Sequence, residues 1–240
     1  MRVLFLLVFA LTFSQVSKVS SQSVEQALSQ AVGEMKKANS RFESEIKDTS
    51  ELYSRLSGLL SFSGCDCDID KGSCSADVKL VPGEARSELI ITVSVARPYC
   101  ARVGTFITTQ WDIDNNTPAY ESFNYLREPQ HSEWVHNADW NGRQPVLLDD
   151  VSCKLCATGD SQFCEESNGL AEKYGPLALT NAQAAKQMEE PVAQMKATAT
   201  ESWVELADLT AYQMGLIYQT ADLYQKLADM VQTQRQSRCH

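Results

Sequence analysis

Eight cysteines are the side chains in this 240-residue sequence with the widest choice of chemistry. They could form disulfides, bind zinc or exchange electrons, and the compartment of the protein decides between these uses. They are Cys65, Cys67, Cys74, Cys100, Cys153, Cys156, Cys164 and Cys239.

The pair Cys153 and Cys156 has the CxxC spacing of a dithiol redox motif. Redox work needs a thiolate with a lowered pKa, and the acidic residues Asp149 and Asp150 just upstream oppose that shift. We therefore expect these two cysteines to be structural.

The first 21 residues predict the compartment. Arg2 precedes an apolar run, Val3–Phe13, and a polar stretch follows up to Ser21. This pattern is typical of a secretory signal peptide at residues 1–21, and the run is shorter than the roughly twenty residues that span a bilayer. We expect a secreted, extracellular protein without a membrane span, in which the cysteines form disulfides and no cofactor is bound.

Three aspartates alternate along the chain at Asp66, Asp68 and Asp70, as the first three ligands of a calcium loop do. An EF-hand loop needs glycine at its sixth position and a bidentate glutamate at its twelfth, where this chain has Lys71 and Asp77. Weak calcium binding by the three aspartates is therefore an alternative to a solvated acidic turn.

Aromatic side chains gather within one thirty-residue stretch, at Trp111, Tyr120, Phe123, Tyr125, Trp134 and Trp140. We expect most of them in the core of a small β domain, with stacking of Trp134 and Trp140 on glycans as the alternative. The same stretch contains the sequon Asn115-Asn116-Thr117, so Asn115 is a candidate glycosylation site, although Pro118 follows directly and weakens it.

Catalytic motifs are sparse. His131 and His136 are the only histidines besides His240, and a spacing of five does not place two ligands on one helix face. The chain has neither a GxSxG elbow nor a glycine-rich phosphate loop. We expect a protein that is not an enzyme. Its net charge of −10 also argues against a nucleic-acid partner.

Helical periodicity occupies both ends of the chain. Residues 22–62 carry apolar or small side chains at spacings of four and three, beginning with Val24, Leu28, Ala31 and Met35. Residues 171–236 repeat the pattern before a short tail at 237–240, and Pro191 should kink or restart the helix there.

The intervening residues 63–170 have a different pattern. Glu88–Ala96 alternates between apolar and polar side chains, which predicts a half-buried strand. Without parallel crossovers, the sheet should be antiparallel. Weaker strands are predicted at Ala76–Val81, Val103–Trp111, Ala119–Tyr125 and Pro145–Val151.

The fold expected is therefore α+β, with long amphipathic N- and C-terminal helices flanking a disulfide-rich antiparallel β insert. In a simple antiparallel coiled coil, Cys239 would lie far from the insert and would bond another chain, giving self-association. In a three-helix bundle the chain folds back near Gly215 and returns Cys239 to the insert, and we favour this arrangement.

The function expected is that of a secreted, acidic, non-catalytic structural or interaction protein. Its partner would be an extracellular macromolecule or a matrix, including a mineralised matrix with weak calcium contact. A secreted protein that binds a small ligand or glycan is the first alternative, and a carboxylate-dependent secreted hydrolase is the second.

Overall fold

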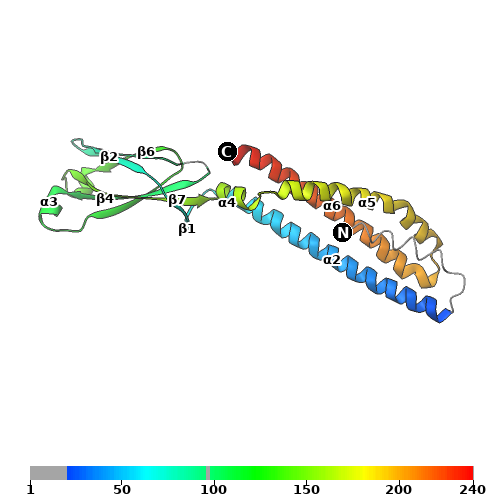
Figure 1. The fold of residues 1–240 in the computed structure, drawn as a ribbon. Coiled ribbons are helices and arrows are strands. Elements are labelled where there is room, and N and C mark those ends of the chain that lie inside the picture. Colours follow the sequence, from blue (N-terminus) through cyan, green and yellow to red (C-terminus); the bar gives the residue numbers. More distant parts are fainter. Residues whose placement is uncertain (1–20, 96–97, 240) are drawn as a thin grey trace. The chain divides into compact units, whose positions relative to one another are not determined.

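A computed structural model describes residues 21–95 and 98–239 (Figure 1). Most of the predicted signal peptide, residues 1–20, lies outside the described residues. The protein is α+β, as predicted, and none of its described helices has the length and apolar character that crossing a membrane requires. Its elements are α2 (Ser21–Ser61), β1 (Cys65–Ser73), β2 (Ala76–Val81), β3 (Arg86–Val93), β4 (Cys100–Thr109), α3 (Gln110–Asp114), β5 (Tyr120–Leu126), β6 (Gln130–His136), η2 (Asn137–Trp140), β7 (Pro145–Thr158), α4 (Gly159–Glu166), α5 (Leu170–Thr198), η3 (Glu201–Trp203) and α6 (Val204–Arg238).

The chain divides into two compact units, which are described here one at a time. The helical unit contains the described residues up to Glu51 together with residues 173–226. The β unit contains residues 52–172 and residues 227–239. The boundaries fall inside helices α2, α5 and α6.

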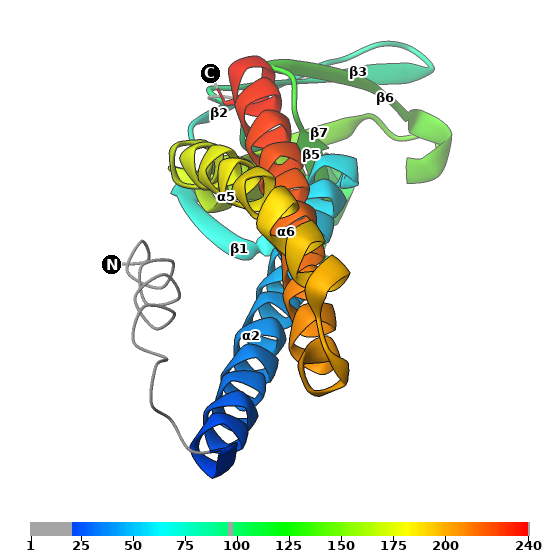
Figure 2. The same cartoon turned by 90° about the vertical axis from the view of Figure 1, so that its right-hand side faces the viewer.

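In the helical unit, α6 contacts both other helices, and Figure 2 shows the three alongside one another. From α2, Asn39 donates a hydrogen bond to the carbonyl oxygen of Leu209 (3.1 Å), and Glu45 accepts one from the hydroxyl of Tyr224. From α5, the ring of Tyr174 lies 4.9 Å from that of Tyr224. Because α6 packs on two sides, it needs apolar residues over a wider face than a single seam provides.

Tyrosine hydroxyls bind glutamates on the neighbouring helices at two further points. Tyr212 donates to Oε1 of Glu43 (2.8 Å) on α2, and Tyr218 donates to Glu189 on α5. The hydrogen bond to Glu43 raises the pKa of Tyr212, and the bond to Glu189 raises the pKa of Tyr218. Both tyrosine hydroxyls therefore keep the proton that they donate at neutral pH.

Two details of the C-terminal helices differ from the sequence prediction. Gly215, the expected point of fold-back, lies inside α6, and the chain reverses instead between α5 and α6. The ion pair between Lys196 and Asp208 (3.2 Å) joins the two helices across this reversal. The helix does not restart at Pro191, which lies within α5, whereas the other expected outcome, a kink at Pro191, is not contradicted.

The β unit consists of two antiparallel sheets with an apolar core between them. One sheet has the strand order β1-β7-β4-β5 and the other β2-β3-β6. All five predicted strands are confirmed, β2 with its predicted bounds, whereas β1 and β6 were not predicted. The buried core residues are Leu89, Ile91, Val93, Ala101, Val103, Ile107 and Leu126.

Disulfides connect all eight cysteines, as predicted for an oxidising compartment. Three of them join β1, or the residue that follows it, to β4 and β7. The fourth ties the end of α6 to α4, so Cys239 has a partner within its own chain. The pairs are Cys65–Cys100, Cys67–Cys156, Cys74–Cys153 and Cys164–Cys239.

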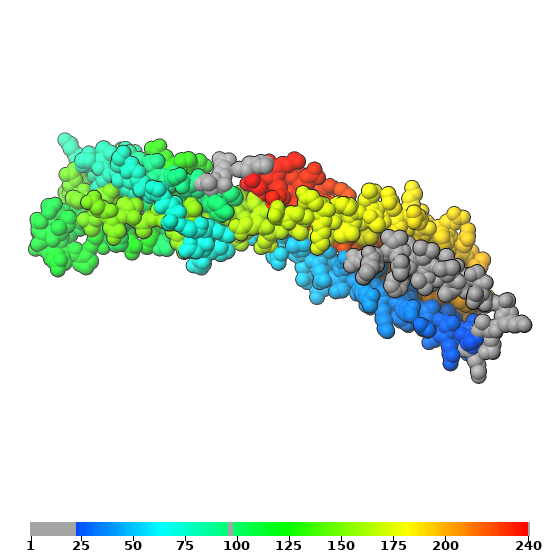
Figure 3. Space-filling view, viewed as in Figure 1, coloured from blue at the N-terminus to red at the C-terminus, as the bar shows by residue number. Residues whose placement is uncertain are grey.

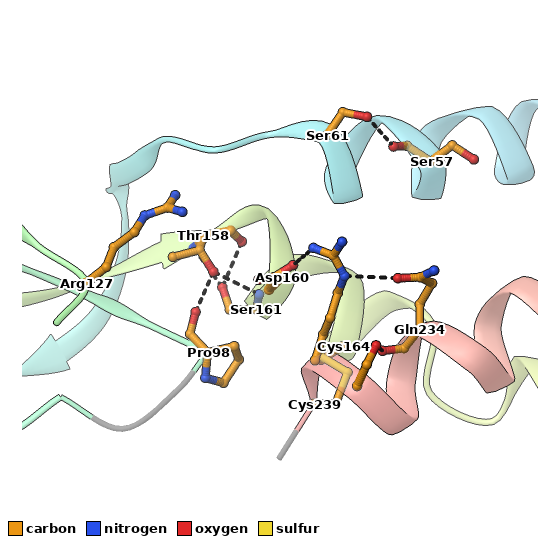
Figure 4. A network of polar contacts seen from close by, with 12 residues as sticks. Ser57, Ser61, Pro98, Arg127, Thr158, Asp160, Ser161, Cys164, Gln234 and Cys239 are labelled. Carbon is orange, nitrogen blue, oxygen red and sulfur yellow. Dashed lines mark hydrogen bonds and ion pairs between the residues drawn. A yellow bond between two sulfur atoms is a disulfide. The ribbon is translucent and has the colours of Figure 1, made fainter.

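Polar contacts reinforce the attachment of α6 to α4 (Figure 4). Arg235 donates from Nη1 to the carbonyl oxygen of Cys164 (2.5 Å) and to Oγ of Ser167 (3.1 Å). Arg238 forms an ion pair with Asp160 at 2.7 Å. A guanidinium placed at the carboxyl end of α4 satisfies a carbonyl that the helix cannot pair.

Removing the disulfide between α6 and α4 should lower the stability of the protein. For the double variant Cys164→Ser, Cys239→Ser we expect the free energy of unfolding to fall by about 2–4 kcal/mol, because the unfolded chain gains freedom. Denaturant titration measures this loss. Non-reducing electrophoresis of the unaltered protein should give no covalent dimer, and a dimer that disappears on reduction would contradict the assigned pairing.

Gly159 begins α4 in a place without room for a side chain. A Cβ there would lie 2.0 Å from the carbonyl oxygen of Leu59 and 2.7 Å from that of Phe62. We expect Gly159→Ala to lower the free energy of unfolding by about 1–3 kcal/mol.

Gly58→Ala is the matched control for Gly159→Ala. It lies within α2, where nothing stands within 4 Å of the new Cβ, so it should stabilise by about 0.5–1 kcal/mol. Thermal unfolding of the two variants measures whether each change in stability is a loss or a gain. Equal changes would contradict the tight contact at Gly159.

Candidate functional site

Three connections of the β unit lie together at one end of its sheets, where Figure 1 shows α3. We name this region the loop end and define it as the turn 82–85 with the adjoining Arg86, the loop 110–119, and the segment 137–144 with Trp134 of the preceding strand. Thr109 pairs with Pro145, which places α3 beside the segment that precedes β7. In the space-filling view, green and yellow-green residues form the surface of this end of the β unit (Figure 3).

A buried asparagine fixes the geometry of the loop end. Asn137 donates from Nδ2 to the carbonyl oxygens of Gly83 (3.3 Å) and Glu84 (2.8 Å), and its backbone N–H donates to Ala85 (3.1 Å). These bonds hold η2 against the turn between β2 and β3. Asn137 therefore braces η2 against a turn of the three-stranded sheet β2-β3-β6.

The aromatic residues expected in the core are instead at the surface, so that prediction is wrong. The exposed fractions are 50% for Trp111, 63% for Tyr120, 40% for Phe123, 58% for Tyr125 and 50% for Trp134. Only Trp140 is packed against the core cluster, and it is half-buried. The physical reason is placement, because β5 and β6 are edge strands and α3 lies beyond the end of β4.

Arginines lie on the faces of two of these tryptophans. The guanidinium carbon of Arg86 is 3.9 Å from the ring centroid of Trp134, and that of Arg143 is 4.0 Å from Trp111. Such cation–π contacts contribute about 0.5–1 kcal/mol at exposed sites. They hold the rings in one orientation while the charge stays accessible to a partner.

Tyr120 and Trp140 complete the aromatic set of this region. Their ring centroids are 6.3 Å apart with an interplanar angle of 76°, which is the edge-to-face geometry that aromatic pairs favour. The more buried Trp140 thereby positions the more exposed Tyr120. Three of the four tryptophans of the chain therefore lie at the loop end or beside it.

The candidate glycosylation site also lies at the loop end. Asn115 is the C-cap of α3 and is exposed, and its Nδ2 donates to the carbonyl oxygen of Trp111 at 2.7 Å. N-glycosylation would use one of the two hydrogens of this Nδ2. Glycosylation at this position remains a prediction.

Two of the three aspartates of the calcium hypothesis, Asp66 and Asp70, accept hydrogen bonds from nearby backbone N–H groups. Oδ1 of Asp66 accepts from the backbone N–H of Asp68 (3.1 Å), and Oδ1 of Asp70 accepts from that of Gly72 (2.8 Å). Among the described residues, no three acidic, histidine or cysteine side chains are arranged to hold a metal ion. Weak calcium binding by Asp66, Asp68 and Asp70 stays a prediction.

The two described histidines both lie in β6, where their odd spacing directs them to opposite faces. Nε2 of His131 lies 3.8 Å from Oε2 of Glu133, whose other oxygen accepts from Nδ2 of Asn124 (3.3 Å). These three polar groups lie where β5 and β6 border the sandwich. Nothing in the sequence indicated the contact between Asn124 and Glu133, because neither β6 nor its register was predicted.

Comparison with known protein families, with curated proteins and with solved structures found no significant match to this chain. Its function must therefore be argued from its own residues.

The pKa of the Asp70 carboxyl group depends on its hydrogen bond and on its neighbouring charge. The hydrogen bond from Gly72 and the charge of Lys154, whose Nζ lies 3.5 Å away, hold the pKa of Asp70 below its ordinary value of about 3.9. The ionised carboxylate of Asp70 therefore stabilises the folded protein at a pH above the ordinary pKa, and this stabilisation is lost as the pH falls through the lowered pKa.

NMR titration of the side-chain carboxyl carbon measures this pKa directly. Lys154→Gln should raise it towards 3.9, whereas Lys79→Gln, which removes a lysine paired with Asp77 (3.2 Å), should leave it unchanged. An Asp70 pKa at or above the ordinary value would contradict the geometry.

Proposed function

We propose that this chain is a secreted, non-catalytic interaction protein whose loop end binds an extracellular macromolecule. The observation that carries the proposal is the pair of half-exposed tryptophans, Trp111 and Trp134, each stacked against an arginine. Four disulfides and the absence of a membrane-spanning helix among the described residues agree with an extracellular setting.

The chemistry of the loop end suits a protein partner. Tryptophan, tyrosine and arginine are enriched among the residues that carry binding energy in protein interfaces. The two aromatic side chains bury a large area with few rotatable bonds. Here Arg86 and Arg143 restrain the rings before binding, which lowers the entropy lost on association.

We propose that α2, α5 and α6 form a three-helix bundle, with α6 in contact with both others. The contacts of Tyr224 with Glu45 and Tyr174, and that of Tyr218 with Glu189, support this arrangement. A two-helix coiled coil would not use residues on two sides of α6.

An extracellular or mineralised matrix is a suitable setting for such a protein. The net charge of −10 favours association with cationic components of a matrix, and it keeps the protein soluble when free. We do not include direct calcium binding by Asp66, Asp68 and Asp70, because two of these carboxylates already accept hydrogen bonds from nearby backbone N–H groups.

A glycan is the second candidate ligand of the loop end. It is favoured by the exposure of Trp134, since sugar rings stack on accessible indole faces. One face of Trp134 is already covered by Arg86, which leaves at most the other for a sugar.

Saturation binding to extracellular matrix from the source organism tests the proposed function. We expect Trp111→Ala and Trp134→Ala each to weaken binding by about tenfold or more, because hot-spot truncations cost about 2 kcal/mol. Leu179→Ala, which shortens an exposed apolar residue of the helical unit, is the matched control and should bind normally.

A glycan array separates the two ligands. Binding to a defined glycan that Trp134→Ala abolishes would favour the second candidate. Unchanged matrix binding by both tryptophan variants, with intact folding, would refute the loop end as the binding surface.

A further inference from the structure

We propose that two copies of this chain associate through strand β5. The two strands would pair antiparallel about a twofold axis and join the two four-stranded sheets into one continuous sheet of eight strands. This inference is independent of the proposed function, because it uses the outer edge and outer face of β5 and leaves the loop end unoccupied.

Strand β5 has an open edge. It is the last strand of its sheet and pairs only with β4, in a ladder without register shifts from Ala101 with Leu126 to Ile107 with Tyr120. Among the described residues, no backbone hydrogen bond outside that ladder reaches residues 120–126. An unpaired row of N–H and C=O groups is a template for another strand.

The other edges of the two sheets carry protection that β5 lacks. Strand β1 is interrupted by two register shifts and bears three aspartates. Strand β2 presents Asp77 and Lys79, and Pro82 follows its last residue. Strand β6 begins with three exposed polar residues. Such bulges and charges prevent edge pairing, whereas β5 has Glu121 as its single charge.

The outer face of β5 is complementary to itself. Asn124 pairs with the core residue Val103, so Asn124 is on the core-facing side of β5. Because side chains alternate between the two faces of a strand, the residues on the outer face are Glu121, Phe123, Tyr125 and Arg127. Antiparallel pairing centred on Asn124 sets Glu121 opposite Arg127 of the second copy, and Phe123 opposite its Tyr125. Symmetry repeats both pairs, which gives two ion pairs and two aromatic pairs.

The aromatic part of this face is held in position before association. Phe123 lies over Gly104, where an added Cβ would be 3.0 Å from its ring, and the guanidinium of Arg102 is 3.7 Å from the ring centroid. The ring remains 40% exposed. Its immobilisation therefore costs little when a second copy covers it.

Arg127 is exposed, and one of its guanidinium nitrogens donates to the carbonyl oxygen of Gly64 (2.7 Å), the residue before β1. The ion pair with the second copy requires this guanidinium to turn from Gly64 towards the open edge of β5. A second copy fits this face better than an unrelated strand, because both charges find their opposites only in this symmetric register.

Sedimentation equilibrium of the mature protein over a range of concentrations tests the proposal. We expect a dimer that dissociates on dilution. Glu121→Arg and Arg127→Glu should each raise its dissociation constant about threefold to tenfold, because like charges then face each other at two places. The double variant Glu121→Arg, Arg127→Glu restores opposite charges and should return the constant to within about threefold of the original.

Phe123→Lys places a charge at the centre of the paired face and should raise the constant at least tenfold. Val81→Lys is the matched control, because Val81 is exposed to a similar extent (48%) on edge strand β2, and it should not change the constant. Circular dichroism verifies that each variant folds.

A protein that stays monomeric at every concentration would overturn the proposal, as would a dimer that none of the β5 variants weakens. Matrix binding through the tryptophans of the loop end would persist in either case, so failure here is distinguishable from failure of the proposed function.

Discussion

The attachment of β1 to the rest of its sheet is the constraint on which the β unit depends. None of the nine residues of β1 is buried, so the strand gains little from the hydrophobic effect. Its ladder with β7 is broken by two register shifts. Three disulfides connect Cys65, Cys67 and Cys74 to β4 and β7 instead, which fixes the entry of the chain into the β unit by covalent bonds.

This dependence explains which strands the sequence could predict. Strand β3 alternates between buried and exposed residues around Leu89, Ile91 and Val93, and that pattern alone predicts a strand. Strand β1 has no such alternation, because its position comes from cysteines whose pairing cannot be deduced from sequence. The sequence therefore predicted the class and most strands, but not the edge that the disulfides hold.

The helical unit shows a second limit of sequence reasoning. The periodic pattern of residues 171–236 continues across the reversal after Thr198, and the segment there has neither glycine nor proline to indicate a turn. The expected signals, Pro191 and Gly215, both lie inside helices. The contacts of α6 with α2 and α5 are long-range contacts that local propensity does not contain.

The candidate site was missed in part for a related reason. Composition predicted that aromatic residues would fill a small core, but the core between the sheets is already supplied by aliphatic side chains of β3 and β4. The aromatic residues follow the core strands in the sequence, on edge strands and loops, where burial is incomplete.

Two tryptophans of the loop end are exposed and yet ordered, because hydrogen bonds hold the backbone and cation–π contacts hold the rings. Asn137 connects η2 to the turn between β2 and β3 through its side-chain amide, and Arg86 and Arg143 restrain the two exposed tryptophans. A surface of large rings that kept its rotational freedom would lose much of its binding energy on ordering. An aromatic surface braced in this way can retain binding energy for a partner while contributing little to the stability of the β unit itself.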